Sequence, residues 1–122
     1  MNDATKPTKI FCDDAAADAG APGLDTQGVD TPHRFALMMD GRQAGFIEYS
    51  LYGRTAIVTH TEIRSEYGGR GLGTELASQA VRFFTARGWQ VVPVCGFFAR
   101  HLRTHPEHAA AATPASRRIF DL

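Results

Sequence analysis

Residues 67–74 read Tyr67-Gly68-Gly69-Arg70-Gly71-Leu72-Gly73-Thr74, a glycine-rich turn that carries one arginine. A strand-like run ends shortly before this turn at Ile63, and a helix-like run begins within it near Gly71. Glycine admits backbone conformations that are closed to other residues, and it leaves room for a ligand to approach the chain. The N-terminus of the following helix directs unpaired amide hydrogens and a positive dipole end to the same place. The sequence therefore predicts a cradle for a phosphate or pyrophosphate group.

The spacing of the glycines distinguishes among known cradles. A dinucleotide-binding fold requires Gly-x-Gly-x-x-Gly and a P-loop requires Gly-x-x-x-x-Gly-Lys-Ser/Thr, and neither pattern is present. The turn resembles the acyl-coenzyme A pyrophosphate motif Gln/Arg-x-x-Gly-x-Gly/Ala, with Gly71 and Gly73 as the two small residues. The first motif position holds Gly68, which lacks the polar side chain found there. The alternative interpretation is an ordinary glycine-rich connector before a helix.

Length and composition indicate one small domain. The chain has 122 residues with a hydrophobic fraction of 43%, which is enough for a single core. No apolar run approaches the roughly 18 residues of a membrane span, and no basic segment followed by an apolar stretch opens the chain. We therefore expect a cytoplasmic protein without a membrane partner. Two cysteines, Cys12 and Cys95, form neither a disulfide framework nor a zinc-finger pattern.

Charge divides the chain into two parts. Residues 1–32 hold six aspartates against two lysines, whereas residues 33–122 hold eleven arginines against seven acidic residues. The first part has no sustained hydrophobic periodicity, so we expect a mostly disordered acidic tail. The second part is mildly cationic, which suits an anionic ligand. It is too weakly basic to favour a nucleic-acid partner.

Hydrophobic periodicity predicts an α/β (α+β) fold. Asp40-Gly41 is a hairpin signal between two strands, and Leu72, Leu76 and Ala80 recur every four residues along a helix. The region from 111 to 122 is rich in alanine and undetermined. The expected elements are strands over 35–39, 44–52 and 55–63, a helix over 71–87, a strand over 89–94 and a short helix over 97–104.

The resemblance extends beyond the glycine turn, over residues 33–110. These residues are similar to the short YjdJ-type branch of the GNAT (GCN5-related N-acetyltransferase) superfamily. This similarity implies a minimal GNAT fold: a mixed, mostly antiparallel sheet, a central strand–glycine turn–helix–strand unit and a short C-terminal helix. The segments that carry it, besides the turn, are His60-Thr61-Glu62-Ile63, Val92-Pro93-Val94-Cys95 and Arg103-Thr104-His105-Pro106-Glu107.

The resemblance implies acetyl-coenzyme A (acetyl-CoA) as the cosubstrate. In GNAT folds the strand before the glycine turn and the strand after the helix splay apart, and the pantetheine arm lies in the opening. Arg70 would add charge-assisted contacts, and Arg100 and Arg103 form either a solvated face or a contact to the 3′-phosphate. The residues expected to pair with pantetheine are Glu62, Ile63 and Arg64, and those whose amides would hold the pyrophosphate are Gly69, Arg70, Gly71, Leu72, Gly73 and Thr74.

Three residues are candidates for catalysis. Cys95 follows the second splayed strand and precedes a helix, whose N-terminus can activate a thiol. By the resemblance, it could attack the thioester or relay a proton, although a lone cysteine is also a common small buried residue. Glu62 and His60 share one face of their strand. They are the first and second candidates for the base that deprotonates an amine, or simply polar residues at a strand end.

Three histidines near the end of the chain do not predict a metal site. His101 and His105 are four residues apart on the possible last helix, and His108 follows Pro106. No carboxylate or cysteine pattern accompanies them, so we expect no metal.

The favoured function is an acetyl-CoA-dependent N-acetyltransferase acting on a primary amine. Only the short turn at Asp40 separates the first two strands, where larger GNAT enzymes carry helices that cover the acceptor site. We therefore expect an open acceptor side, suited to a lysine or terminus of a polypeptide or to a small amine. The alternative is a non-catalytic CoA or acyl-CoA-binding module or sensor, which would need the cradle but neither Cys95 nor Glu62.

Overall fold

Five strands form one sheet in the part of the chain that the structure, a computed structural model, describes: residues 9–13 and 30–122. Strand order in the sheet follows chain order, and neighbours are antiparallel except for the last pair, which is parallel. The strands are β1 (Lys9–Asp13), β2 (His33–Met39), β3 (Arg42–Tyr52), β4 (Thr55–Ile63) and β5 (Gln90–Pro93).

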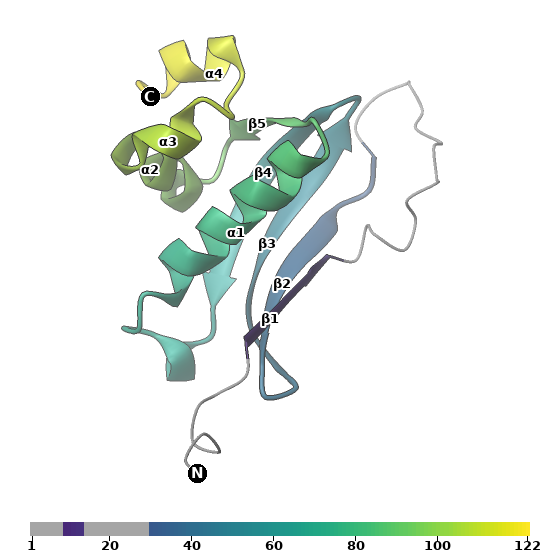
Figure 1. The fold of residues 1–122 in the computed structure, drawn as a ribbon, viewed down its shortest axis with the longest axis vertical. Helices are drawn as coiled ribbons and strands as arrows, with labels where there is room; N and C mark the ends of the chain where they lie inside the picture. Colours follow the sequence, from purple (N-terminus) through teal and green to yellow (C-terminus); the bar gives the residue numbers. More distant parts are fainter. Residues whose placement is uncertain (1–8, 14–29) are drawn as a thin grey trace.

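One face of this sheet carries the main helix, which crosses β3 and β4 (Figure 1). The other helices gather near β5 at the C-terminal end of the chain (Figure 1). The predicted mixed α/β fold is confirmed, including the central strand–turn–helix–strand unit. The helices are α1 (Leu72–Ala86), α2 (Gly96–Thr104), α3 (Pro106–Ala109) and α4 (Pro114–Ile119), and a 3-10 turn, η3 (Ser65–Tyr67), precedes α1.

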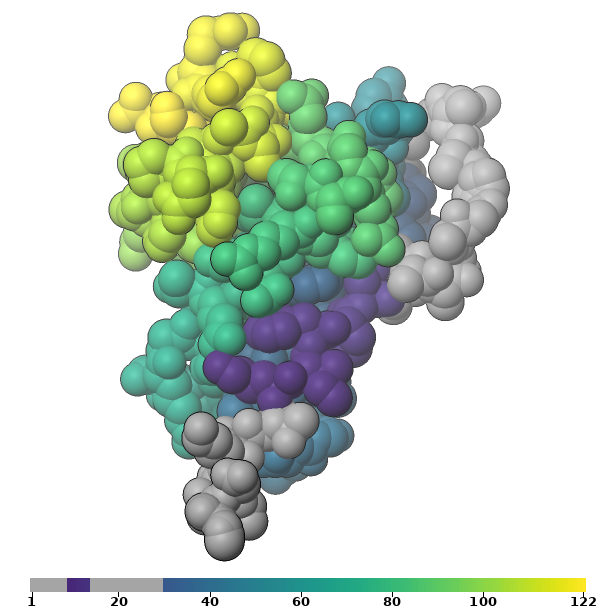
Figure 2. Space-filling view, in the orientation of Figure 1, coloured from purple at the N-terminus to yellow at the C-terminus, as the bar shows by residue number. Residues whose placement is uncertain are grey.

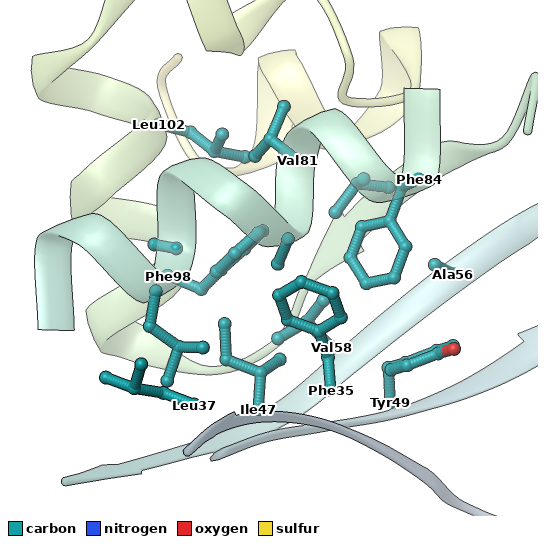
Figure 3. Packing of buried hydrophobic residues seen from close by; sticks show 14 of the residues in the cluster. Phe35, Leu37, Ile47, Tyr49, Ala56, Val58, Val81, Phe84, Phe98 and Leu102 are labelled. Carbon is teal, nitrogen blue, oxygen red and sulfur yellow. The ribbon is translucent and has the colours of Figure 1, made fainter. Parts of the chain in front are cut away.

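The core lies between the sheet and α1. The apolar residues predicted to recur along this helix are buried, and Leu76, Ala80 and Phe84 have no exposed surface. Phe84 packs edge-on against Tyr49 of β3 with ring centroids 4.8 Å apart. On the other side of α1, Val81 faces Leu102 of α2 (Figure 3). Burial of each large side chain stabilises the fold by about 1.5–3 kcal/mol, so α1 fixes both the sheet and α2.

The segment Lys9–Asp13 differs from the predicted disordered tail. It forms β1 and pairs with β2 along its whole length. Phe11 lies against Phe35, with ring centroids 6.2 Å apart, and the Tyr49 hydroxyl donates to Asp13 Oδ2 at 2.6 Å. These partners supply the stability that five residues lack alone. The remainder of the predicted tail, residues 1–8 and 14–29, lies outside the described residues.

The last residues of the chain extend the sheet region. The amide of Val91 donates to Ala111, and the amide of Thr113 donates to Val91, at 2.9 and 3.0 Å. Thr113 also caps α4, because its hydroxyl accepts from the Ser116 amide at 3.1 Å. The outer edge of β5 is therefore paired with residues 111–113.

Candidate functional site

The parallel strands β4 and β5 separate after a short paired stretch. Their register covers Thr55–Val58 against Gln90–Pro93 and goes no further. The Val58 carbonyl accepts from the amides of both Val94 and Cys95, each at 2.9 Å. Beyond this point β4 continues to Ile63, whereas the other chain turns into α2. The far half of β4 therefore has an open edge toward β5, as a splayed pair requires.

A bulge at Thr59 decides which backbone groups this open edge presents. His60 pairs with Glu48 and Val58 pairs with Tyr49, which leaves Thr59 without a partner across the strand. Before the bulge the Val58 carbonyl faces β5, but after it the Arg64 amide faces β3 and donates to Ala44 at 2.8 Å. Backbone groups alternate along a strand. The amide and carbonyl groups of Thr61 and Ile63 therefore face the opening.

This geometry distinguishes the three residues expected to pair with pantetheine. Ile63 offers its backbone at the open edge, while Glu62 turns its backbone to β3, where it pairs with Phe46. Both backbone groups of Arg64 are engaged, because its carbonyl also accepts from the Tyr67 amide at 2.9 Å. The half-exposed side chain of Arg64 lies 3.9 Å from Glu66, between Nε and Oε1. Besides Ile63, Thr61 presents its backbone groups at the open edge, a position that the sequence reasoning did not single out.

The glycine turn leaves a run of amide groups unpaired. Within the described ranges, none of the amides from Gly69 to Thr74 donates a hydrogen bond, and the first paired amide of α1 is that of Glu75, which donates to Gly71 at 3.2 Å. Gly69 and Gly71 have φ of 75° and 73°, in the left-handed region that favours glycine. A Cβ at either position would meet nothing within 4 Å. We call residues 69–74 the phosphate cradle, because unpaired amides and free space suit a pyrophosphate.

One cation lies in the cradle, and the acid in the first turn of α1 is paired with another. Arg70 lies in the cradle itself, with its guanidinium carbon 5.6 Å from the centre of the Tyr67 ring. Glu75, in the first turn of α1, forms an ion pair with Lys9 of β1 at 2.8 Å. β1 lies on the surface beside α1, which brings this lysine to the helix (Figure 2). The local field therefore favours an anion.

A phenyl ring from α2 closes one side of the cradle. A Cβ added to Gly73 would lie 3.0 Å from the ring tip of Phe97, so glycine allows the two helices to approach. Phe97 is itself partly exposed, at 39%. Sequence reasoning missed this residue, because a phenylalanine next to a helix start reads as part of the core.

Cys95 caps the N-terminus of α2 at the mouth of the opening. Its backbone is extended, with ψ of 127°, and its thiol is half-buried and free. The Sγ atom donates to Thr61 Oγ1 at 3.5 Å. Cys95 also packs against the edge of the core below α1. The thiol therefore lies on the face of the sheet that carries the helices. The second free thiol, Cys12 in β1, is exposed.

His60 and Glu62 lie together on the opposite face. Their side chains approach to 3.2 Å between Nε2 and Oε1, and both are about half exposed, at 53% and 54%. The His60 ring also lies 5.9 Å from the Phe46 ring. Side chains alternate along β4, so these two point away from the face that Thr61 and Cys95 share. The structure brings the two candidate bases together, and places the thiol across the strand from them.

The three histidines of the C-terminal region also come together, with their rings stacked. Among the described residues, no group of three or more His, Cys, Asp or Glu side chains is arranged to hold a metal ion. None of the helices in the described ranges combines the length and apolar content that a membrane crossing needs.

Comparison with protein families places the chain beside known acetyltransferases. The model of a family described as GCN5-related N-acetyl-transferase matches residues 34–111, which include the sheet from β2 onward, the cradle and Cys95. A comparison with curated proteins gave no match. The family match does not distinguish branches, so the YjdJ-type assignment stays a prediction. Because the matched segment is well over half of the chain and contains the splayed strands and the cradle, the protein belongs to the GCN5-related N-acetyltransferase family.

Proposed function

We propose that the protein is an acetyl-CoA-dependent N-acetyltransferase that transfers the acetyl group to a primary amine. The observation that carries this proposal is the run of six unpaired amides in the cradle, directly after the open edge of β4. A CoA thioester presents the two complementary parts, a pyrophosphate and an amide-bearing arm. Family membership supplies the acetyl-transfer chemistry.

The chain's own residues would hold this cosubstrate in two places. The amides of residues 69–74 would donate to the pyrophosphate, and Arg70 would add charge. The backbone groups of Thr61 and Ile63 would pair with the amides of the pantetheine arm, as a further strand pairs with a sheet edge.

Two routes of transfer are compatible with the positions of the side chains. In direct transfer, the amine nitrogen attacks the thioester carbonyl, the bond from that carbon to the CoA sulfur breaks, and a base takes the ammonium proton. In the covalent route, the Cys95 thiolate attacks the thioester carbonyl first and CoA leaves as its thiolate. The amine then attacks the S-acetyl carbonyl, and the bond from that carbon to the Cys95 sulfur breaks to release the Cys95 thiolate. Glu62 and His60 lie across the strand from Cys95, so their role in either route is to deprotonate the amine.

The acceptor would enter from the sheet face opposite α1. Arg34 lies over the Phe46 ring on this face, with its guanidinium carbon 4.0 Å from the ring centre. His60 and Glu62 continue the same exposed surface toward the opening. An exposed face of this kind admits an amine on a polypeptide, at a lysine or a terminus, as readily as a small amine. We propose a cytoplasmic enzyme that uses neither nucleic acid nor a membrane as partner.

The second candidate is a CoA or acyl-CoA-binding module without catalysis. It is favoured by the separation of Cys95 from the two candidate bases, because neither base can activate the thiol directly. Such a module would keep the cradle and the open edge and would act as a sensor.

Mass spectrometry of the intact protein distinguishes these functions. All variants carry Cys12→Ser, because Cys12 is exposed and would itself react with a thioester. Cys12→Ser alone is compared with Cys12→Ser/Cys95→Ala and Cys12→Ser/Glu62→Gln after incubation with acetyl-CoA, and binding is measured by calorimetry. A single acetyl adduct that needs Cys95 supports the covalent route.

Acetylation of an added amine supports direct transfer if it survives Cys95→Ala and falls with Glu62→Gln. Tight binding with neither product supports the module. Absence of acetyl-CoA binding in every variant would contradict the proposed function.

A further inference from the structure

A stacked cluster of three imidazoles lies beside the site and has no part in the proposed function. We call His101, His105 and His108 the histidine cluster. The His101 ring centre lies 4.1 Å from that of His105 and 5.1 Å from that of His108, with each pair of rings stacked. His101 is only 4% exposed, and it lies on the same buried face of α2 as the core residues Phe98 and Leu102. A buried polar ring in an apolar helix face is unusual.

Hydrogen bonds of the cluster join three helices. His101 Nε2 on α2 lies 3.0 Å from His108 Nδ1 on α3 and 3.5 Å from the Ser78 hydroxyl on α1. His105 Nδ1 lies 2.8 Å from the His101 carbonyl oxygen, so this nitrogen carries a hydrogen. The cluster therefore fastens α2 and α3 to α1.

Only one hydrogen can lie between the two facing ring nitrogens, His101 Nε2 and His108 Nδ1. A neutral imidazole has one donor and one acceptor nitrogen, whereas a protonated imidazole has two donors. When both rings are protonated, two N–H groups and two positive charges face each other across 3.0 Å. The bond is then lost and the rings repel.

The surroundings favour the neutral cluster at neutral pH. Burial, followed by the charges of His105 and His108, lowers the pKa of His101 to about 4. Burial also lowers the pKa of His108. The charged groups that act on the cluster are Arg82 of α1, which opposes protonation, and Glu107 of α3, which favours it. Acidification therefore adds charge to a site built for neutral rings.

The helix held by the cluster also forms part of the site. α2 begins at Cys95, and Phe97 in its first turn lies against Gly73 of the cradle. Figure 3 shows Leu102 of α2 packed near Val81 of α1, close in sequence to the histidines. A movement of α2 away from α1 would therefore displace Phe97 from the cradle and Cys95 from the opening.

We propose that the histidine cluster is a pH-sensitive link between α2 and α1. Protonation of the cluster breaks this link, so that α2 moves away from α1 and acyl-CoA binding weakens. The binding part of this inference rests on the proposed function, but the movement of α2 does not. Coupling of this kind between two sites changes an affinity by about 5–150-fold. We expect acetyl-CoA affinity to fall at least about fivefold from pH 7.5 to pH 5.0.

The test compares the wild type with His101→Phe, which keeps an aromatic ring against Phe98 and removes the titrating group. His33→Gln is the matched control, because His33 lies on β2 beside Asp30 and outside the cluster. Calorimetry with acetyl-CoA at both pH values should show the fall in wild type and His33→Gln, and its loss in His101→Phe. A fall of the same size in His101→Phe would overturn the proposal.

Hydrogen exchange of the free protein tests the movement without any ligand. After correction for intrinsic exchange rates, amides of residues 96–109 should lose protection at pH 5.0 in wild type and keep it in His101→Phe. Equal protection of these amides at both pH values in wild type would overturn the proposal. If acetyl-CoA fails to bind even at pH 7.5, the proposed function fails, and this exchange experiment still decides the role of the cluster.

Discussion

Replacement of Gly45 by alanine tests how the open edge of β4 is held. Gly45 lies on β3 opposite Ile63, the last residue of β4. A Cβ at position 45 would lie 2.6 Å from the Glu62 carbonyl oxygen and 2.5 Å from Ile63 Cδ1. The isoleucine can rotate, but the carbonyl is part of the strand. The strand must therefore move until the distance from this Cβ to the Glu62 carbonyl oxygen, 2.6 Å without movement, approaches an ordinary contact of about 3.5 Å.

The expected cost follows from two opposed terms. Overpacking a well-filled core costs about 1–3 kcal/mol, and replacing a strand glycine with alanine returns about 0.5–1 kcal/mol. We expect a net loss of about 1–2 kcal/mol, which lowers the urea midpoint by about 1 M for a domain of this size. Acetyl-CoA affinity should fall as well, because the displaced segment carries the Ile63 backbone groups.

Gly96→Ala is the matched control, because a Cβ at that position meets nothing within 4 Å. Urea unfolding and calorimetric titration with acetyl-CoA are measured for both variants. Gly96→Ala should stay within about 0.5 kcal/mol of wild type. If Gly45→Ala matches it in both stability and affinity, the described fit of β3 against the end of β4 is wrong.

Three further predictions concern the cradle, the core and acidification. Gly71→Ala forces alanine to φ of 73° and should cost about 1–2 kcal/mol in urea unfolding; an unchanged midpoint would refute the left-handed cap. Phe98→Ala leaves a cavity at a fully buried position and should lower the free energy of unfolding by about 3–5 kcal/mol in the same assay. A decrease of less than about 1 kcal/mol would contradict the burial of Phe98. The folded pKa of His101 is depressed from 6.5 to about 4, so its stabilising effect is complete above pH 6.5 and is lost as pH falls toward 4. It amounts to about 3 kcal/mol at most, and a flat stability profile between those pH values would contradict it.

Most of the fold follows from local sequence patterns. Leu72, Leu76 and Ala80 recur at a helical period, and all three face the core in α1. The Asp40-Gly41 signal also holds, since both residues adopt positive φ, 52° and 81°, as a tight hairpin turn requires. The predicted limits of these elements differ from the observed ones by one or two residues, because helix and strand ends depend on their neighbours.

Long-range partners determine what the sequence did not predict. β1 is only five residues long, and its pairing with β2 bridges a long stretch of intervening chain, so no local pattern announces it. The single-residue bulge at Thr59 reverses the alternation along β4, so that each later residue faces the side that its neighbour would face without the bulge. It places Thr61 beside Cys95 and leaves Glu62 on the other face. A pattern of period two cannot locate such a bulge.

His101 shows the same limitation in a helix. It is a polar residue and yet is buried, because His108 and Ser78 satisfy its ring nitrogen. The partner on α3, His108, can be identified only when the path of the chain at Pro106 is known. Sequence reasoning had considered these residues for a metal and not for a hydrogen-bonded stack.

The proposed function requires that CoA bind in the cradle and along the open edge of β4. The most direct measurement is a ¹⁵N–¹H correlation spectrum of the protein titrated with CoA. We expect saturable shifts of the amides of residues 69–74, among them three glycines in a distinct spectral region, together with those of Thr61 and Ile63. Amides of β1 and β2 should stay in place. Absence of saturable shifts in residues 69–74 at millimolar CoA, or shifts confined to other elements, would contradict the proposed function.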